Sequence, residues 1–273
     1  MKRILIPTDF SPCAKNALQI GAAIAKTSKA ELLLLHVLYS PIGLEKLPAK
    51  LSDYPDVKAA VSKTKDLFKK ELANPALKGI PVDTKIDVGS AAPTILYTAR
   101  SWKADLIVIG SHGITEADHP FVGSNAQKVI RGAECPVLAV QKDHTIKNLK
   151  QLTFASSFDG GNVKPCEKIL DIASVLKVSV HLLHVNTPVE FRNSQEINSL
   201  VDNFEKNFPK EKFTRALYDD YDVHSGVANY MKENPKGIVA LTTRTRHRKP
   251  SYTLGFTESV AYHSPVPVLI VNM

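Results

Sequence analysis

The sequence predicts an α/β fold built from two tandem, doubly wound sheets, each with five parallel strands in the order 3-2-1-4-5. Similar segments recur in the same order in both halves of the chain. The strand segments are continuous runs of Val, Ile and Leu, which is typical of strands covered on both faces in a parallel sheet. Helical segments with one apolar face lie between them, and such alternation indicates right-handed crossovers.

The internal repeat is visible at four pairs of segments. The first two pairs are offset by 148 residues and the third by 132, because the second copy is shorter between its second and fourth strands. The paired segments are 3–11 (RILIPTDFS) with 151–159 (QLTFASSFD), 31–37 (ELLLLHV) with 179–185 (SVHLLHV), 105–110 (DLIVIG) with 237–242 (GIVALT), and 135–140 (CPVLAV) with 266–271 (VPVLIV). Four matches in the same order predict an internal duplication.

A polar, unpatterned segment at 142–148 (KDHTIKN) is the predicted linker. We therefore expect a first domain at 1–143 and a second at 149–273. Helices of the first domain are expected at 16–25 and 92–102. Its strands are expected at about 3–8, 31–38, 82–87, 104–110 and 137–141, with counterparts in the second domain.

Composition narrows the class of protein. Of the 273 residues, 44% are apolar and 23% charged, which is ordinary for a globular protein. The N-terminus does not resemble a secretion signal, and no apolar run is long enough for a membrane helix. Three widely separated cysteines, Cys13, Cys135 and Cys166, predict reduced thiols in a cytoplasmic protein. The net charge of +8 is spread along the chain without an RNA-binding or zinc-finger signature, so we do not expect nucleic acid as a partner.

The expected ligand site lies beyond the carboxyl ends of the strands, where the strand order reverses. Asp9 follows the first strand, and its carboxylate can accept from a ribose hydroxyl or an adenine amino group. Gly110 and Gly113 follow the fourth strand and allow a tight turn close to a phosphate. Gly123 and Ser124 then read as a helix N-terminus, which favours phosphate. The alternative is structural, because glycines are common in turns and Asp often caps a helix.

These residues resemble the universal stress protein (UspA) family. The pattern Gly-x2-Gly-x9-Gly-Ser lies between DLIVI and CPVLAV, and the opening ILIPTDFS is similar to that family's first strand and loop. The resemblance covers both halves, as in a tandem member. It implies a Rossmann-like, adenine-nucleotide alpha hydrolase-like fold, with an adenine-nucleotide site in members that keep the glycine motif.

The resemblance also implies a role for each site residue of the first copy. It assigns Pro7, Thr8 and Asp9 to the adenosine, the backbone of Val37 to the adenine, Ile109 and Gly110 to the ribose and phosphates, and His112, Gly113, Gly123, Ser124, Asn125 and Ala126 to the phosphate chain. His112 is also a candidate on chemical grounds, because an imidazole can donate to phosphate oxygens. Asn125 and Ala126 stand where the family often has a small apolar residue and a hydroxyl residue, which removes a phosphate contact.

The second copy departs from this pattern. Thr242 and Thr245 occupy the glycine positions, Phe256 replaces the serine after Gly255, and Ser157 stands in place of Asp9. We therefore expect one nucleotide per chain, with a second half that stabilises and pairs with the first. The basic residues of this altered loop are expected to form a solvated surface, with an anion site as the alternative; they are Arg244, Arg246, His247, Arg248 and Lys249.

The expected function is a nucleotide-binding protein of stress response or regulation. No P-loop, dinucleotide fingerprint, nucleophile elbow or zinc motif is present, so at most slow ATP hydrolysis is expected. The alternatives are a weak ATPase using the same site and an interaction module with a vestigial site. ATP, ADP and AMP stay open as ligands.

Three further points concern ions, histidines and assembly. Mg²⁺ could accompany the nucleotide, with Asp9, or Glu116 and Asp118, as the carboxylates considered. His36 and His184 end matching strands and are predicted to be structural, with satisfied hydrogen bonds. In the resembled family the final edge strands pair two domains, which a tandem chain can achieve internally; a homodimer is the alternative.

Overall fold

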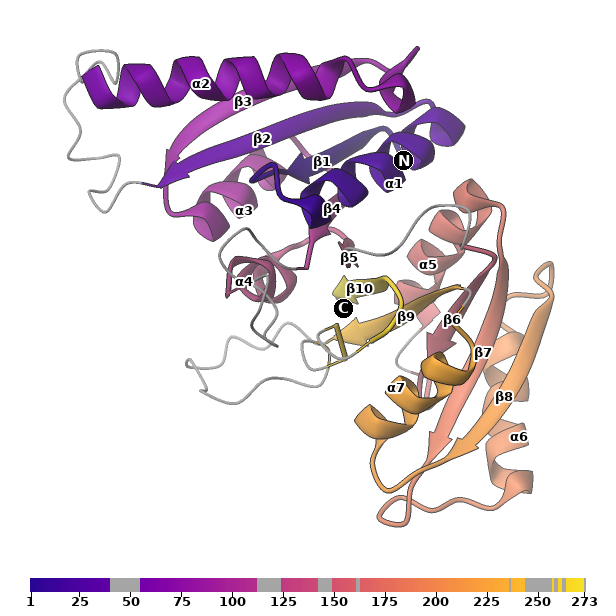
Figure 1. Ribbon diagram of the computed structural model, residues 1–273. Helices are drawn as coiled ribbons and strands as arrows, with labels where there is room; N and C mark the ends of the chain where they lie inside the picture. The colour runs from indigo at the N-terminus through magenta and orange to yellow at the C-terminus, as the bar shows by residue number, and fades with distance from the viewer. Residues whose placement is uncertain are drawn as a thin grey trace. The chain divides into compact units, whose positions relative to one another are not determined.

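The computed structural model describes residues 1–39, 55–111, 124–141, 149–160, 163–235, 237–243, 257, 260–261 and 264–272. The chain divides into two compact units, Met1–Asp143 and His144–Met273. Each unit is a parallel sheet with helices packed against it (Figure 1). Within the described ranges, no helix is both long and apolar enough to span a bilayer.

The first unit has the predicted strand order. Its sheet runs β3-β2-β1-β4-β5, and all four neighbouring pairs are parallel. The elements are β1 (Arg3–Pro7), α1 (Pro12–Ser28), β2 (Glu31–Tyr39), α2 (Pro55–Leu72), the short 3-10 helix η3 (Pro75–Leu77), β3 (Val82–Gly89), α3 (Ala91–Ser101), β4 (Leu106–Gly110), α4 (Ser124–Gly132) and β5 (Val137–Val140).

The second unit repeats this order along its own chain. Its sheet runs β8-β7-β6-β9-β10, again with parallel pairs, so the 3-2-1-4-5 prediction is confirmed for this copy as well. The elements are β6 (Gln151–Ala155), α5 (Val163–Leu176), β7 (Ser179–Asn186), α6 (Ser194–Glu205), β8 (Phe213–Asp219), α7 (Val223–Glu233), β9 (Gly237–Thr243) and β10 (Val268–Asn272).

Equivalent residues of the two units are paired in the same register within their own sheets. The repeat in the sequence is therefore also a repeat in the structure. Partners in β1 and β2 are related to the second unit by an offset of 148, partners in β4 by 132, and partners in β3 and β5 by 131. Examples of matched pairs are Arg3 with Glu31 and Gln151 with Ser179, then Ile4 with Leu106 and Leu152 with Ile238. The duplication therefore extends to individual backbone positions.

The inner strands are buried on both faces, as their apolar runs predict, whereas β3 and β8 at the outer edges are partly exposed. Ile4, Leu5 and Ile6 of β1 are fully buried. Gly21 of α1 lies against β1, where an added Cβ would come within 2.5 Å of Cδ1 of Ile6. The helix therefore packs close to the sheet at this position.

Helix α1 is longer than the predicted 16–25. Ser11 caps its N-terminus by accepting from the Ala14 N–H, Pro12 occupies the first turn, and Lys29 ends it in the left-handed conformation. Apolar periodicity underestimated the helix because these capping positions lie outside the apolar stripe.

Candidate functional site

The turn after β1 is held in place by its own side chains. The Phe10 N–H donates to Oγ1 of Thr8 at 3.0 Å, and the Ser11 N–H donates to Oδ1 of Asp9 at 3.0 Å. The Thr8 N–H donates to the Leu35 carbonyl at 2.8 Å, which ties the turn to β2. Asp9 therefore has a structural role, but it holds the turn and Ser11 caps the helix; the same hydrogen bond fixes the position of its half-buried carboxylate.

His36 is a second support for this turn. Its Nδ1 lies 2.7 Å from the Thr8 carbonyl oxygen, so this nitrogen carries the proton and donates. The ring packs against Phe10, with centroids 4.9 Å apart, and Phe10 has a positive φ of 63°. The predicted structural role of His36 is confirmed. Its ring holds both neighbours of Asp9, because it bonds to Thr8 and packs against Phe10.

The equivalent turn of the second unit lacks part of this support. Ser156 and Phe158 repeat the backbone contacts, with the Ser156 N–H donating to the Leu183 carbonyl at 3.1 Å. His184 also lies over its turn, and a hydrogen bond with the Ser156 backbone opposes the effect of burial on its pKa, although its Nδ1 makes no bond as well aligned as that of His36. Burial lowers the pKa of His184, which favours the neutral ring. The prediction of a satisfied histidine is therefore confirmed for His36, and His184 makes the weaker contact of the two.

Val37 offers its backbone at the end of the sheet. Leu35 of β2 turns its carbonyl toward β1, where it accepts from Thr8. Alternate residues of a strand direct their backbone groups to the same side, so the N–H and C=O of Val37 also face the β1 side. The last residue of β1, Pro7, is paired with Leu35. Val37 comes two residues later in β2 and therefore lies beyond the end of β1. A planar group with hydrogen-bonding edges can pair with a backbone placed in this way.

The end of β4 lies beside the same turn. β1 and β4 are neighbours, with Leu5 paired to Ile107, so Ile109 and Gly110 lie at the level where β1 ends. A Cβ on Gly110 would lie 2.9 Å from the Ala14 nitrogen and 2.9 Å from the Cys13 carbonyl carbon. The first turn of α1 therefore requires glycine at this position, whether or not a phosphate approaches it.

The structure describes only part of the predicted phosphate segment. His112, Gly113 and Gly123 lie outside the described residues, as do Glu116 and Asp118. Ser124 begins α4, Asn125 is exposed and Ala126 is buried. The Ala126 side chain is therefore directed into the core, and a contact with phosphate would have to come from its backbone.

The corresponding positions of the second unit are also partly described. Ser157 is exposed and Thr242 half-buried, whereas Thr245, Gly255, Phe256 and the basic residues at 244 and 246–249 lie outside the described ranges. Within the described ranges of both units, no group of three or more His, Cys, Asp or Glu could hold a metal ion.

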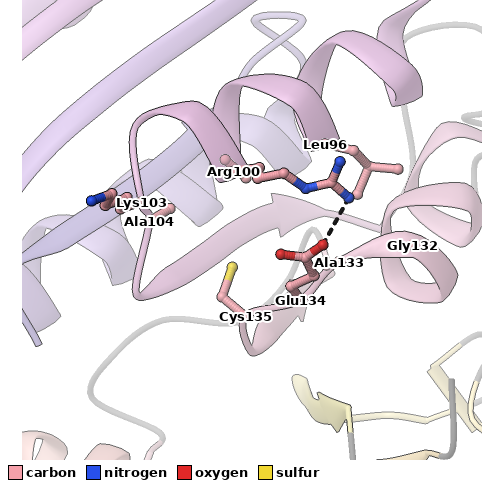
Figure 2. A pocket seen from close by; sticks show the side chains of 9 residues that line it. Leu96, Arg100, Lys103, Ala104, Gly132, Ala133, Glu134 and Cys135 are labelled. Carbon is pink, nitrogen blue, oxygen red and sulfur yellow. Dashed lines mark ion pairs between the residues drawn. The ribbon is translucent and has the colours of Figure 1, made fainter.

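A separate pocket lies where α3 and α4 end, and sequence reasoning did not identify it (Figure 2). Arg100 and Glu134 face one another across it, with Nη2 and Oε1 2.8 Å apart. Cys135 also lines it. Because helices α3 and α4 run back from the carboxyl ends of their strands, this pocket is at the opposite end of the sheet from Asp9 and Gly110.

The three thiols are expected to differ in reactivity. Cys13 and Cys166 are buried, and burial, together with nearby Glu167 and Glu211, raises the pKa of Cys166 to about 12. Cys135 is only half-buried. Since the thiolate is the reactive form, we expect a thiol reagent to label Cys135 at least about tenfold faster than the other two in the folded protein.

Mass spectrometry of the labelled protein checks this order. All three thiols should react in denaturant, and Cys135→Ser should remove the fast site. Rapid labelling of Cys166 in the folded chain would contradict the burial of this residue in α5.

The comparisons with known proteins agree with this geometry. The model of the universal stress protein family matches residues 1–141. The chain belongs to the universal stress protein family. A universal stress protein of Thermus aquaticus is 37% identical over 142 residues, which are 51% of this chain and 98% of that protein. Universal stress protein MJ0531 of Methanocaldococcus jannaschii is 35% identical over 143 residues, which are 52% of this chain and 82% of that protein.

Solved structures extend the likeness in fold to the whole chain. A universal stress protein from Archaeoglobus fulgidus has a TM-score of 0.74 at 17% identity, over 99% of this chain and 98% of that one. A putative universal stress protein from Pseudomonas aeruginosa has a TM-score of 0.68 at 16% identity, over 100% of this chain and 93% of that one. The second half of this universal stress protein thus keeps the fold, although the family model matches only the first half.

Proposed function

We propose that this universal stress protein binds one adenine nucleotide per chain, in its first unit, and acts in stress response or regulation. The observation that carries the proposal is the convergence of three features at one end of the sheet. They are the fixed Asp9 carboxylate, the Val37 backbone beyond the end of β1, and the adjoining end of β4. A crevice at this reversal of strand order is the usual ligand position in such sheets.

Asp9 and Val37 have complementary roles in this proposal. Val37 supplies a backbone donor and acceptor, which suit the edge of an adenine ring. The Asp9 carboxylate is an acceptor only, which suits a ribose hydroxyl. Because the turn is already held by Thr8, Ser11 and His36, little ordering is needed when the nucleoside binds.

The phosphate part of the proposal depends on the glycine motif and α4. The motif Gly-x2-Gly-x9-Gly-Ser leads into α4, whose first residue is Ser124. Free N–H groups and the positive end of the dipole at a helix start favour a phosphate by roughly 0.3–1 kcal/mol per charge. One family member has been solved in complex with cAMP; for this chain the proposal depends on its own residues.

Two matched substitutions test which unit binds. Gly113→Leu puts a bulky side chain at a glycine position of the first copy, and Thr245→Leu does the same at the equivalent position of the second. In titration calorimetry with ATP, the first should weaken binding by at least about tenfold, the cost of one lost charged hydrogen bond. The second should leave binding unchanged. Equal affinity for ATP in Gly113→Leu and the unaltered protein would contradict the proposal. Release of phosphate from ATP faster than in a sample without protein would show that the same site also hydrolyses ATP slowly.

A further inference from the structure

The second unit carries a concentration of exposed apolar side chains on two neighbouring loops. The loop between β7 and α6, residues 187–193, presents Val189 and Phe191, which are 89% and 70% exposed. The loop between β8 and α7, residues 220–222, presents Tyr221, which is 87% exposed, and Val223 follows it at the start of α7. We call these four side chains the loop patch. Both loops leave the same end of the sheet, because β7 and β8 are parallel neighbours (Figure 1).

Hydrogen bonds tie the two loops to each other. The buried Asn186, at the end of β7, donates from Nδ2 to Oδ1 of Asp219, and its Oδ1 accepts from the Arg192 N–H at 3.0 Å. Its backbone carbonyl accepts from the Asp220 N–H at 3.1 Å. One buried residue therefore links both loops.

Helix caps fix the far ends of the same loops. Asn193 and Glu196 form a capping box at the start of α6, and Asp222 caps α7 by accepting from the Ser225 N–H. The exposed apolar side chains are thus displayed on a backbone fixed at both ends. A surface ordered before binding loses less entropy when a partner docks.

Acidic residues outnumber basic ones on and beside the two loops of the loop patch. Glu190, Asp219, Asp220 and Asp222 lie on or beside the two loops, against a single guanidinium of Arg192. Asp219, Asp220 and Asp222 accept hydrogen bonds from Asn186, Asn229 and Ser225, which are neutral donors. None of the three carboxylates forms an ion pair with any residue that the structure describes.

We propose that the loop patch is a docking site for a basic, partly apolar peptide segment of a partner protein, one that carries Lys or Arg beside aliphatic residues. The apolar side chains supply buried area, and the surrounding carboxylates select for positive charge. This acidic surface stands out in a chain whose net charge is +8.

Charge also argues against a symmetric contact between two copies. A two-fold dimer through this surface would bring the same carboxylates of both copies together, and like charges across an interface oppose binding. The exposed apolar area of the loop patch comes from only four side chains. An area of this size suits a short peptide segment rather than the surface of a folded domain.

Fluorescence polarisation tests the proposal with a defined probe. The probe is a short fluorescein-labelled peptide that alternates lysine and leucine, and its counterpart carries glutamate in place of each lysine. We expect saturable binding of the basic peptide that weakens as salt is raised, and no binding of its acidic counterpart. Phe191→Ser combined with Tyr221→Ser should lower the affinity for the basic peptide by at least about tenfold.

Tyr97→Ser is the matched control, since Tyr97 is a similarly exposed aromatic residue of the first unit. It should leave binding unchanged. The proposal is wrong if both peptides bind equally well, or if the double variant binds the basic peptide as tightly as the unaltered protein does. Neither result depends on whether the chain binds a nucleotide. A dimer of the unaltered chain in sedimentation velocity that the double variant abolishes would assign the loop patch to a second copy instead.

Discussion

Gly110→Ala is expected to lower the free energy of unfolding of the first unit by about 1–3 kcal/mol, the range for overpacking where the backbone must move. The added Cβ would lie 2.9 Å from two backbone atoms of α1, the Ala14 nitrogen and the Cys13 carbonyl carbon. Backbone atoms of a capped helix cannot rotate away as a side chain can. The helix and β4 must therefore separate for the new methyl group to fit.

Gly132→Ala is the matched control for this experiment. There the added Cβ would lie 2.6 Å from Cδ1 of Leu96, the flexible end of a side chain that can adopt another rotamer. We expect a change within about 1 kcal/mol for this variant, partly offset by the better helix propensity of alanine.

Trp102 gives the readout for both variants. It is the only tryptophan of the chain and lies in the first unit, so its fluorescence during urea unfolding reports on that unit. Equal stability of Gly110→Ala and the unaltered protein would show that β4 and α1 are less closely packed than described.

Asp9→Asn and Asp9→Ala together separate the ligand role of Asp9 from its structural role. Asn keeps an oxygen that can accept from the Ser11 N–H but loses the negative charge, whereas Ala loses both. We expect both variants to weaken ATP binding by at least about tenfold, because hydrogen bonds to charged groups contribute about 1.5–3 kcal/mol. Only Asp9→Ala should also destabilise the first unit, by about 1 kcal/mol for the lost hydrogen bond within the turn.

Ser157→Ala is the control in the second unit, since Ser157 stands where Asp9 would be. It should leave the affinity for ATP unchanged. ATP binding by Asp9→Asn that equals the unaltered protein would reduce Asp9 to a residue of the turn. Titration calorimetry for binding and urea unfolding for stability measure the two effects independently.

The strands and their equivalence between the two copies could be predicted because they depend on local pattern and on repetition. Continuous apolar runs mark buried strands, and a second copy of each run fixes which segments are equivalent. The place of Asp9 beside the end of β4 follows from strand order alone, since β1 and β4 are neighbours.

Contacts between distant elements could not be predicted in the same way. The need for glycine at Gly110 arises from the position of α1 relative to β4, which no local pattern records. The difference between His36 and His184 is similar, because the residues match in sequence while only His36 makes a short, well-aligned hydrogen bond to the turn before it. The loop patch was also missed, since exposed apolar residues in a sequence look the same as buried ones.

The most direct test of the account is the nucleotide content of the purified chain. The protein is denatured, and any released nucleotide is identified by mass spectrometry and its molar ratio to chain determined. We predict about one adenine nucleotide per chain after saturation with millimolar ATP and removal of the excess, and none in Gly113→Leu. Two nucleotides per chain would contradict the assignment to the first unit alone, and a chain that stays empty under these conditions would contradict nucleotide binding itself.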